Sequence, residues 1–345
     1  MLTTALAPGY RISRVIKGGW QLSCGHGQYA IEMSSAIENM HAFVQAGITT
    51  FDCGDIYIGV EELIGEFLRQ NPTLRPRIQL HTKYVPDMDR LSSLTEKDTE
   101  LVIDRSRVRL GVDTLDVVQF HWWDYGVDRY REVYEHLLQL QQRGKIRHVG
   151  VTNFDVPHME KLLQIQNPLS IQVQYSLLDR RPEHGMTTLC QENNVAFLAY
   201  GTVAGGLLSD KYVGMKECNF VPANRSLVKY RLIVDEFGGW DLYQALLQAL
   251  EHIAQKYFVS IATIASAYIL QQPAVTAVII GARDTTHLPE NIAICSTSLD
   301  TDDLDSIHAV LQKSQGPLGD VYHLERYSDR HSSIMQKSNN SLFMY

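Results

Sequence analysis

Long hydrophobic runs and basic tracts are absent from this sequence. No stretch approaches the roughly 18 uninterrupted apolar residues of a membrane-spanning helix. Lysine and arginine together number 31 against 39 aspartates and glutamates, which gives a formal net charge of −8. An acidic chain without a basic cluster is poorly suited to bind nucleic acid or an anionic membrane. We therefore expect neither as its main partner.

Cysteine is scarce, and its spacing suggests no pairing. The five cysteines are odd in number and never occur as CxxC, which is typical of a protein from a reducing compartment. The first ten residues, MLTTALAPGY, have neither the basic start nor the apolar run of a signal peptide. We therefore expect a cytoplasmic protein. Its 45% hydrophobic and 20% charged residues favour a large folded core over disorder.

Short β-branched runs alternate with amphipathic stretches of helical period. Strands are predicted at 15–20, 49–53, 78–83, 116–121, 146–151, 170–174, 195–200 and 276–280. The clearest helices between them are predicted at 34–46, 61–69, 130–142, 241–257 and from Ser260 to Pro273. Eight strands alternating with helices favour a parallel (β/α)8 TIM barrel, because eight strands close the sheet. The alternative is an open doubly wound sheet, but no GxGxxG follows the first strand.

Two segments depart from this regular alternation. The stretch from Tyr200 to Trp240 is too long for a simple connection and is predicted to be a lid or binding loop. Residues 315–345 are polar with scattered aromatics, and they are predicted to form a tail over the barrel. The tail aromatics either touch the substrate or only pack on the barrel: Tyr322, Tyr327, Phe343 and Tyr345. The expected organisation is a single barrel domain at 1–314 followed by a tail at 315–345.

Polar residues gather where the predicted strands end. In such barrels the carboxyl ends of the strands, and the loops beyond them, build the active site. The second strand leads to Asp52 and Tyr57, the third to Lys83 and the fourth to His121. The other strands lead to Gly19 and Trp20, Thr152 and Asn153, Gln172 and Tyr175, Tyr200, and Gly281 with Arg283.

An acid, a phenol, a lysine and an imidazole at one edge of a barrel can carry out proton transfer. A tyrosine has an ordinary pKa near 10, and a neighbouring ammonium lowers that pKa. A carboxylate holds the ammonium in place, and a histidine can donate a hydrogen bond to a carbonyl oxygen. Asp52, Tyr57, Lys83 and His121 therefore form a predicted proton-donor site for an oxygen that becomes an alkoxide. The hydride that such a reaction needs must come from a nicotinamide.

Other residues at the same edge suit that cofactor. Thr152, Asn153 and Gln172 carry hydroxyl and amide groups that could hold a carboxamide, and Tyr200 could stack on the nicotinamide ring. Arg283 precedes a predicted helix start, where anions bind favourably, and it could grip a 2′-phosphate. We therefore expect NADP(H) in preference to NAD(H). Trp20, Trp122 and Trp123 are either core or walls of an apolar substrate pocket, and we predict the pocket for Trp20 and one of the pair.

The run FDCGDIYIGVEELIG resembles the block that joins Asp and Tyr in the aldo-keto reductases. HTK, QFHWWD, GKIRHVGVTNF, IQVQYSLLDR, LAYGTVAGGLLSDKY and IIGARDTTHLPENI then follow in the family's order, so that the resemblance spans about 10–295. It implies a barrel reductase that passes hydride between NADPH and an aldehyde or ketone, or in reverse, with Tyr57 as general acid. It also implies these cofactor contacts: Gly19, Trp20, Asp52, Thr152, Asn153, Gln172, Tyr200, Gly201, Leu207, Lys211, Gly281, Arg283, His287, Glu290 and Asn291.

The chain also departs from the family's usual pattern. Cys53-Gly54 stands where the family usually has Thr-Ala, so the identity of the small carbonyl or alcohol substrate does not carry over. Two alternatives stay open. One is a cofactor-binding regulatory subunit, like relatives of this family that lie beneath ion channels. The other is a metal-dependent hydrolase on the same barrel, although His81, His121 and His148 form no HxH pair and we expect no metal.

Overall fold

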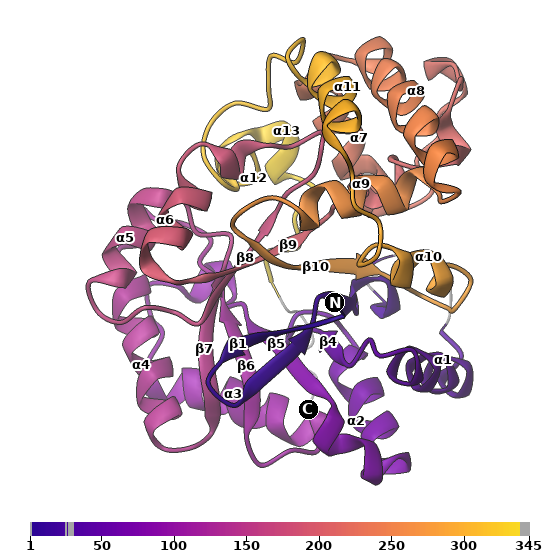
Figure 1. The fold of residues 1–345 in the computed structure, drawn as a ribbon. Helices are drawn as coiled ribbons and strands as arrows, with labels where there is room; N and C mark the ends of the chain where they lie inside the picture. The colour runs from indigo at the N-terminus through magenta and orange to yellow at the C-terminus, as the bar shows by residue number, and fades with distance from the viewer. Residues whose placement is uncertain (1, 25, 27–30, 339–345) are drawn as a thin grey trace.

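The computed structural model describes residues 2–24, 26 and 31–338. Eight parallel strands close into a barrel in the order β10-β3-β4-β5-β6-β7-β8-β9. They are β3 Val15–Gly18, β4 Thr50–Asp52, β5 Gln79–Tyr84, β6 Leu115–Phe120, β7 Ile146–Thr152, β8 Ser170–Gln174, β9 Ala196–Tyr200 and β10 Val275–Gly281. Figure 1 shows these strands at the centre of the molecule with helices around them. The predicted TIM barrel and its eight strands are confirmed.

The barrel strands are buried on both faces, which explains why their sequences are apolar runs. Every residue of β6 is buried. One face lies inside the barrel, where Ile16, Val117, Leu198 and Ala277 pack together. The other face lies under the helices in the larger core. Burial on both sides is the usual environment of a parallel strand.

Helices follow the strands as the alternating pattern predicts. They are α1 Met33–Gln45, α2 Val60–Gln70, α3 Glu96–Leu110, α4 Tyr130–Gln142, α5 Val156–Leu163, α6 Met186–Asn193, α7 Arg225–Phe237, α8 Trp240–Tyr257, α9 Ile261–Leu270, α10 Leu288–Ala293, α11 Thr301–Leu311, α12 His323–Tyr327 and α13 Asp329–Ser332. The predicted helices correspond to α1, α2, α4, α8 and α9, with boundaries that agree to within three residues. Of the described helices, none alone is long and apolar enough to cross a membrane, and α8 with α9 meets that criterion only as a pair bent by 93°.

An N-terminal hairpin precedes the barrel and was not predicted. Strands β1 (Thr3–Ala7) and β2 (Tyr10–Ser13) pair antiparallel, and Gly9 in the turn between them has a φ of 70°. The hairpin contacts the barrel interior through Tyr10, whose hydroxyl lies 3.1 Å from Nε2 of the buried His81. This contact engages Nε2 of one of the three histidines that the metal alternative invoked. Among the described residues no group of three His, Cys, Asp or Glu side chains could hold a metal ion.

The two irregular segments are more ordered than predicted. Between Tyr200 and Trp240 the chain forms α7 as well as short 3-10 turns, so the expected long loop is largely a helical segment. Residues 315–338 contain α12 and α13, and α13 joins α7 through a 3.1 Å contact between His331 Nε2 and Glu236 Oε1. Figure 1 shows α12 and α13 close to α7. Phe343 and Tyr345 lie outside the described residues.

Candidate active site

A cavity of about 750 Å³ opens at the carboxyl ends of the barrel strands. Asp52, Tyr57, Lys83 and His121 line it together, although they come from the ends of three strands and one following loop. The barrel brings them together because adjacent parallel strands end at the same edge. Strand β4 pairs with β5, with Asp52 opposite His81 in the register, so that Lys83 lies just beyond Asp52.

Lys83 forms a buried ion pair with Asp52. Its Nζ lies 2.6 Å from Asp52 Oδ2 and donates a second hydrogen bond to the Cys53 carbonyl oxygen at 2.8 Å. The two side chains are only 6% and 5% exposed. Burial by itself would lower the pKa of Lys83, but the Asp52 carboxylate outweighs it and holds that pKa above its ordinary value. The lysine is therefore a permanent cation in this site.

Tyr57 lies against that cation. Lys83 Nζ is 4.6 Å from the centre of the Tyr57 ring. The centre of the Trp20 ring lies 5.1 Å from the centre of the Tyr57 ring. Burial raises the pKa of the Tyr57 phenol above its ordinary value, and the Lys83 ammonium opposes this shift without cancelling it. Tyr57 is consequently protonated at neutral pH, which is the state that a proton donor requires.

His121 is a neutral imidazole whose orientation is fixed by the backbone. Its Nδ1 lies 3.2 Å from the Thr152 carbonyl oxygen, and because a carbonyl oxygen only accepts, Nδ1 carries the proton. Burial, reinforced by the Arg326 charge, lowers the pKa of His121 to about 3 despite the Thr152 hydrogen bond. Nε2 is buried without a hydrogen-bond partner among the described residues. In this tautomer Nε2 is an acceptor, so the predicted donation from His121 to a carbonyl oxygen is not what the geometry provides.

The polar residues expected to hold a carboxamide also bind one another. Gln172 Nε2 donates to Asp52 Oδ1 at 2.6 Å, and Thr152 Oγ1 donates to the Gln172 carbonyl oxygen at 2.9 Å. The Tyr200 hydroxyl donates to Asn153 Oδ1 at 2.9 Å. Asn153 has a φ of 61°, a conformation that asparagine tolerates better than most residues. All four line the cavity, and Gln172 in addition helps to position Asp52.

The cavity lining also offers unpartnered polar atoms and closely packed backbone. Gln21 Oε1 and Asn291 Nδ2 are buried there without a hydrogen-bond partner among the described residues. Gly201 has a φ of 72°, and a Cβ on it would collide with the Tyr230 hydroxyl. Unpartnered polar atoms in the lining of a cavity of this size fit a large polar ligand such as a dinucleotide. The remaining predicted residues that line the cavity are Lys211, Gly281, His287, Glu290 and Asn291.

Four predicted contacts do not line the cavity. Trp122 is fully buried in the core, where its Nε1 donates to the Asp124 and Val127 carbonyl oxygens. Leu207 is also a core residue. Gly19 donates its backbone N–H to the Asp52 carbonyl oxygen at 2.7 Å, and the side chain of Arg283 is 58% exposed beside Asp284. Trp20 and Trp123 do line the cavity, as predicted for Trp20 and one of the pair.

Sequence reasoning missed the part of the site that α7 and the C-terminal segment supply. Lys229 and Tyr230 of α7 line the cavity, as do Tyr322 and Met335. The Tyr322 ring meets the His121 ring edge-on, with their centres 5.5 Å apart. The sequence indicates Tyr322 only as one of several tail aromatics. The apolar spacing in α7 could have indicated a helix there, but not that Lys229 enters the cavity.

Arg326 connects the C-terminal segment to the strand ends. Its Nη2 donates to the carbonyl oxygens of Trp122 and Asn153, at 2.9 and 2.7 Å. Trp122 follows His121 just beyond β6, and Asn153 follows Thr152 at the end of β7. The C-terminal segment is thus part of the wall and of the support of the site.

Comparison with known proteins gives a consistent picture. The sequence model of the "Aldo/keto reductase family" matches residues 14–312. An aldo-keto reductase of Bacillus subtilis is 26% identical over 324 residues, covering 92% of this chain and 96% of that protein. The NADH-specific methylglyoxal reductase of Escherichia coli is 26% identical over 312 residues, covering 84% and 91%.

Solved structures share the fold. The glycerol dehydrogenase of Gluconobacter oxydans superimposes with a TM-score of 0.75 at 23% identity, covering 90% of this chain and 95% of that chain. An aldo-keto reductase from Klebsiella pneumoniae, solved in complex with NADPH, gives a TM-score of 0.67 at 22% identity, covering 89% and 94%. At these identities the likeness concerns the barrel alone.

Proposed function

The chain belongs to the aldo/keto reductase family, and from that premise we propose that it transfers hydride between NADP(H) and a small aldehyde or ketone. In the reverse direction it oxidises the corresponding alcohol. Asp52, Tyr57, Lys83 and His121 are its catalytic residues, and Tyr57 is the general acid. A reducing, cytoplasmic setting agrees with the five free thiols.

The contact that supports this proposal best is the Lys83 ammonium between a carboxylate and a phenol. It lies 2.6 Å from Asp52 Oδ2 and 4.6 Å from the centre of the Tyr57 ring, inside the cavity. A fixed cation beside a tyrosine stabilises the tyrosinate that remains after the proton has left. A purely structural ion pair would not need a cavity-facing phenol as its third member.

Residues along the cavity suit a nicotinamide dinucleotide, which when bound would supply or accept the hydride. Asn153 and Tyr200 would hold the nicotinamide end, since they line the cavity beside Asp52 and are fixed by their mutual hydrogen bond. Lys211 would pair with the pyrophosphate. His287, Glu290 and Asn291 would surround the adenosine end, where the amide nitrogen of Asn291 has an unused donor.

The choice of NADP(H) over NAD(H) rests on the loop after β10. Arg283 lies there with its side chain 58% exposed, so it is accessible to a 2′-phosphate at the adenosine end. The carboxylates of Asp284, 4.0 Å from Arg283, and of Glu290 would repel a 2′-phosphate. The Arg283 cation has to outweigh this repulsion for NADP(H) to be preferred. The solved relative from Klebsiella pneumoniae contains NADPH, whereas the Escherichia coli relative is named NADH-specific.

The proton path involves Tyr57 and His121 in different roles. Tyr57 donates its proton to the carbonyl oxygen as that oxygen gains negative charge, and Lys83 stabilises the phenolate that is left. After this transfer, His121 Nε2 can accept a hydrogen bond from the new hydroxyl, because its own proton is on Nδ1. In alcohol oxidation the hydroxyl proton passes back to the Tyr57 phenolate. Trp20 and Trp123 form apolar walls beside these groups.

Cofactor titration tests this proposal. Because Trp20 lines the cavity, bound NADPH should quench tryptophan fluorescence. NADPH that binds more tightly than NADH, together with consumption of NADPH in a panel of aldehydes and ketones, supports the proposal. Arg283→Ala should then weaken NADPH binding while NADH binding stays the same. Binding of neither cofactor would reject the function, and equal binding of both would reject only the choice of NADP(H).

A further inference from the structure

A cationic side chain lines the cavity from a helix and not from a strand end. Lys229 extends from α7, lines the cavity and is 14% exposed. Its Nζ lies 5.4, 5.2 and 6.0 Å from the ring centres of Tyr200, Tyr230 and Tyr322. The ammonium is therefore surrounded by aromatic rings and faces the space where a substrate binds.

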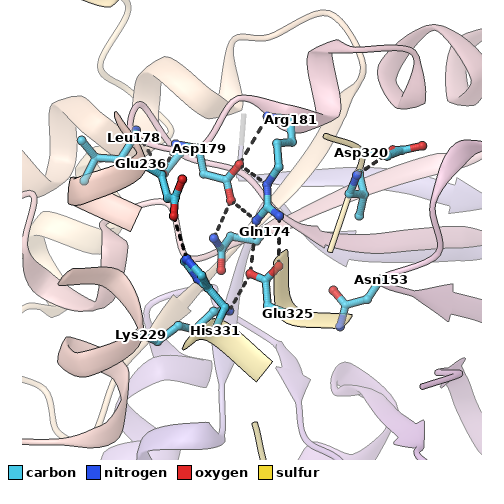
Figure 2. A network of polar contacts seen from close by, with 12 residues as sticks. Asn153, Gln174, Leu178, Asp179, Arg181, Lys229, Glu236, Asp320, Glu325 and His331 are labelled. Carbon is cyan, nitrogen blue, oxygen red and sulfur yellow. Dashed lines mark hydrogen bonds and ion pairs between the residues drawn. The ribbon is translucent and has the colours of Figure 1, made fainter. Parts of the chain in front are cut away.

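Glu325, the charged neighbour of Lys229, already accepts hydrogen bonds from Arg181. Glu325 is fully buried, and both of its carboxylate oxygens accept hydrogen bonds from Arg181, at 3.0 and 3.1 Å. Arg181 also donates to Asp179, so that these three groups form a closed network, with Lys229 at its edge in Figure 2. Lys229 Nζ lies 3.9 Å from Glu325 Oε1, beyond hydrogen-bond distance. Glu325 thus offsets the charge of Lys229, but it does not accept a hydrogen bond from the Lys229 ammonium.

Lys229 is also close to the reacting groups. The centre of the Tyr322 ring lies 5.5 Å from that of His121 and 6.0 Å from Lys229 Nζ. Tyr200, another neighbour of Lys229, is hydrogen-bonded to Asn153 at the proposed nicotinamide end. A short substrate whose carbonyl lies between Tyr57 and His121 can therefore extend a second group towards Lys229.

We propose that Lys229 binds a carboxylate of the substrate, so that the protein prefers carbonyl compounds that carry a carboxylate over otherwise similar neutral ones. This inference rests on the proposed reductase function and identifies its substrate class. A cation that faces a cavity, with donors to spare and partial shielding from water, gains most from an anionic partner. Burial lowers the pKa of Lys229 although Glu325 opposes the shift, and a bound carboxylate would reverse it.

The surroundings favour a singly charged group over a phosphate. Arg326, which lies 5.2 Å from the centre of the Tyr322 ring, is engaged by the Trp122 and Asn153 carbonyl oxygens. Glu325 would repel a dianion more strongly than a monoanion, because it lies 3.9 Å from the same ammonium. The Lys229 ammonium beside a buried carboxylate matches one carboxylate of a short-chain or aromatic oxo acid.

The test compares two near-isosteric aldehydes, 4-formylbenzoate and 4-formylbenzamide, with 3-formylbenzoate as a second spacing. For each one, kcat/KM is measured with saturating NADPH in the wild-type protein and in Lys229→Met, Lys229→Gln and Lys229→Arg. Lys216→Met is the matched control, since Lys216 is exposed and does not line the cavity. We expect the wild type to prefer a carboxylate by about tenfold or more, the usual scale for a charge-assisted hydrogen bond. Lys229→Met and Lys229→Gln should abolish this preference, which is measured as the ratio of kcat/KM for the acid and the amide within each variant. Lys229→Arg and Lys216→Met should retain it.

Three outcomes would overturn the proposal. Equal kcat/KM for the acid and the amide in the wild type is one, and a preference that survives in both neutral variants is another. A marked rise in the Kd of NADPH in those variants, with no change in substrate preference, would instead assign Lys229 to the cofactor pyrophosphate.

A binding measurement separates this inference from the reductase function. If no aldehyde is reduced, the proposed function fails, and calorimetry of 4-(hydroxymethyl)benzoate against 4-(hydroxymethyl)benzamide still decides the site. If the acid binds more tightly than the amide, and Lys229→Met removes this difference, the result would support an anion site in a protein with another activity. Equal binding of both compounds would remove the site as well.

Discussion

Lys83 Nζ lies 2.6 Å from Asp52 Oδ2, and the two side chains are 6% and 5% exposed. Because the pair is buried, each charge depends on the other to offset the loss of hydration. The second oxygen of Asp52 accepts a hydrogen bond from Gln172. The carboxylate is therefore fixed on both sides, and it fixes in turn the ammonium that faces Tyr57.

Removal of the Asp52 charge should destabilise the fold. Asp52→Asn leaves the Lys83 ammonium buried without its counter-ion, for which a cost of about 3–5 kcal/mol is typical. Urea denaturation of both proteins measures this difference in unfolding free energy. Asp128→Asn is a suitable control, because Asp128 is 60% exposed and pairs with Arg131 only at 3.8 Å. Equal stability losses in the two variants would contradict the role given to the buried pair.

The pH dependence of the two reaction directions should differ. Burial holds the pKa of Tyr57 above its ordinary value even with Lys83 present, so that Tyr57 keeps its proton through neutral pH. Carbonyl reduction, which needs that proton, should stay level between pH 6 and 9, whereas alcohol oxidation should rise into the alkaline range. Lys83→Met removes the charge that lowers this pKa and should move the rise to still higher pH. Profiles of kcat against pH in both directions check this, and a reduction rate that falls near neutral pH would argue against Tyr57 as the acid.

The tautomer of His121 can be measured directly. With Nδ1 bonded to the Thr152 carbonyl oxygen and the pKa at about 3, the ring should remain neutral and protonated on Nδ1 between pH 5 and 8. Nitrogen-15 NMR of the histidine rings, assigned with His121→Phe, distinguishes the two tautomers. The same variant should raise KM for an alcohol more than KM for the matching aldehyde, because only the alcohol donates to Nε2. A proton on Nε2 would restore the original interpretation of His121 as a donor.

The C-terminal segment should depend on Glu325. Burial favours the neutral carboxyl, but the charges of Arg181 and Lys229 outweigh it and lower the pKa of Glu325 to about 2. Its stabilising effect is therefore fully present above the ordinary carboxyl pKa and is lost as the pH falls towards 2. Glu325→Gln should lower Tm at pH 7, and the Tm difference between the variant and the wild type should shrink as the pH falls. The variant should also be cleaved faster by proteases within 315–338. A Tm difference independent of pH would contradict the assigned charge network.

Much of the fold follows from local patterns that are visible in the sequence. The eight barrel strands are apolar runs separated by helices of clear period, and this order admits few folds. The N-terminal hairpin was missed because β1 and β2 are short and β1 is only half-buried, so neither gives an apolar run. Helix α7 was hidden in a stretch whose Gly, Asn and Pro residues indicate a loop.

Residue patterns predicted the candidate site where it depends on strand ends, and the family resemblance added Lys211, His287, Glu290 and Asn291. Asp52, Lys83 and His121 could be placed because the ends of parallel strands meet at one edge of the barrel. Consecutive residues point in different directions there, so His121 and Trp123 line the cavity while Trp122 enters the core. Lys229 and Tyr322 could not be placed, since their position depends on how α7 and the C-terminal segment pack over the barrel, which periodicity does not encode.

The central claim is that Tyr57 protonates a carbonyl oxygen that has received hydride, and a single-turnover experiment tests it most directly. Wild-type protein and Tyr57→Phe are each saturated with NADPH and mixed with 4-formylbenzamide, and the loss of nicotinamide absorbance is followed. Tyr327→Phe serves as a control, because Tyr327 is 57% exposed and lies outside the cavity lining. We predict a rate at least ~10²-fold lower in Tyr57→Phe, with an unchanged Kd for NADPH, and a wild-type rate in the control. A Tyr57→Phe rate close to that of the wild type would contradict the account.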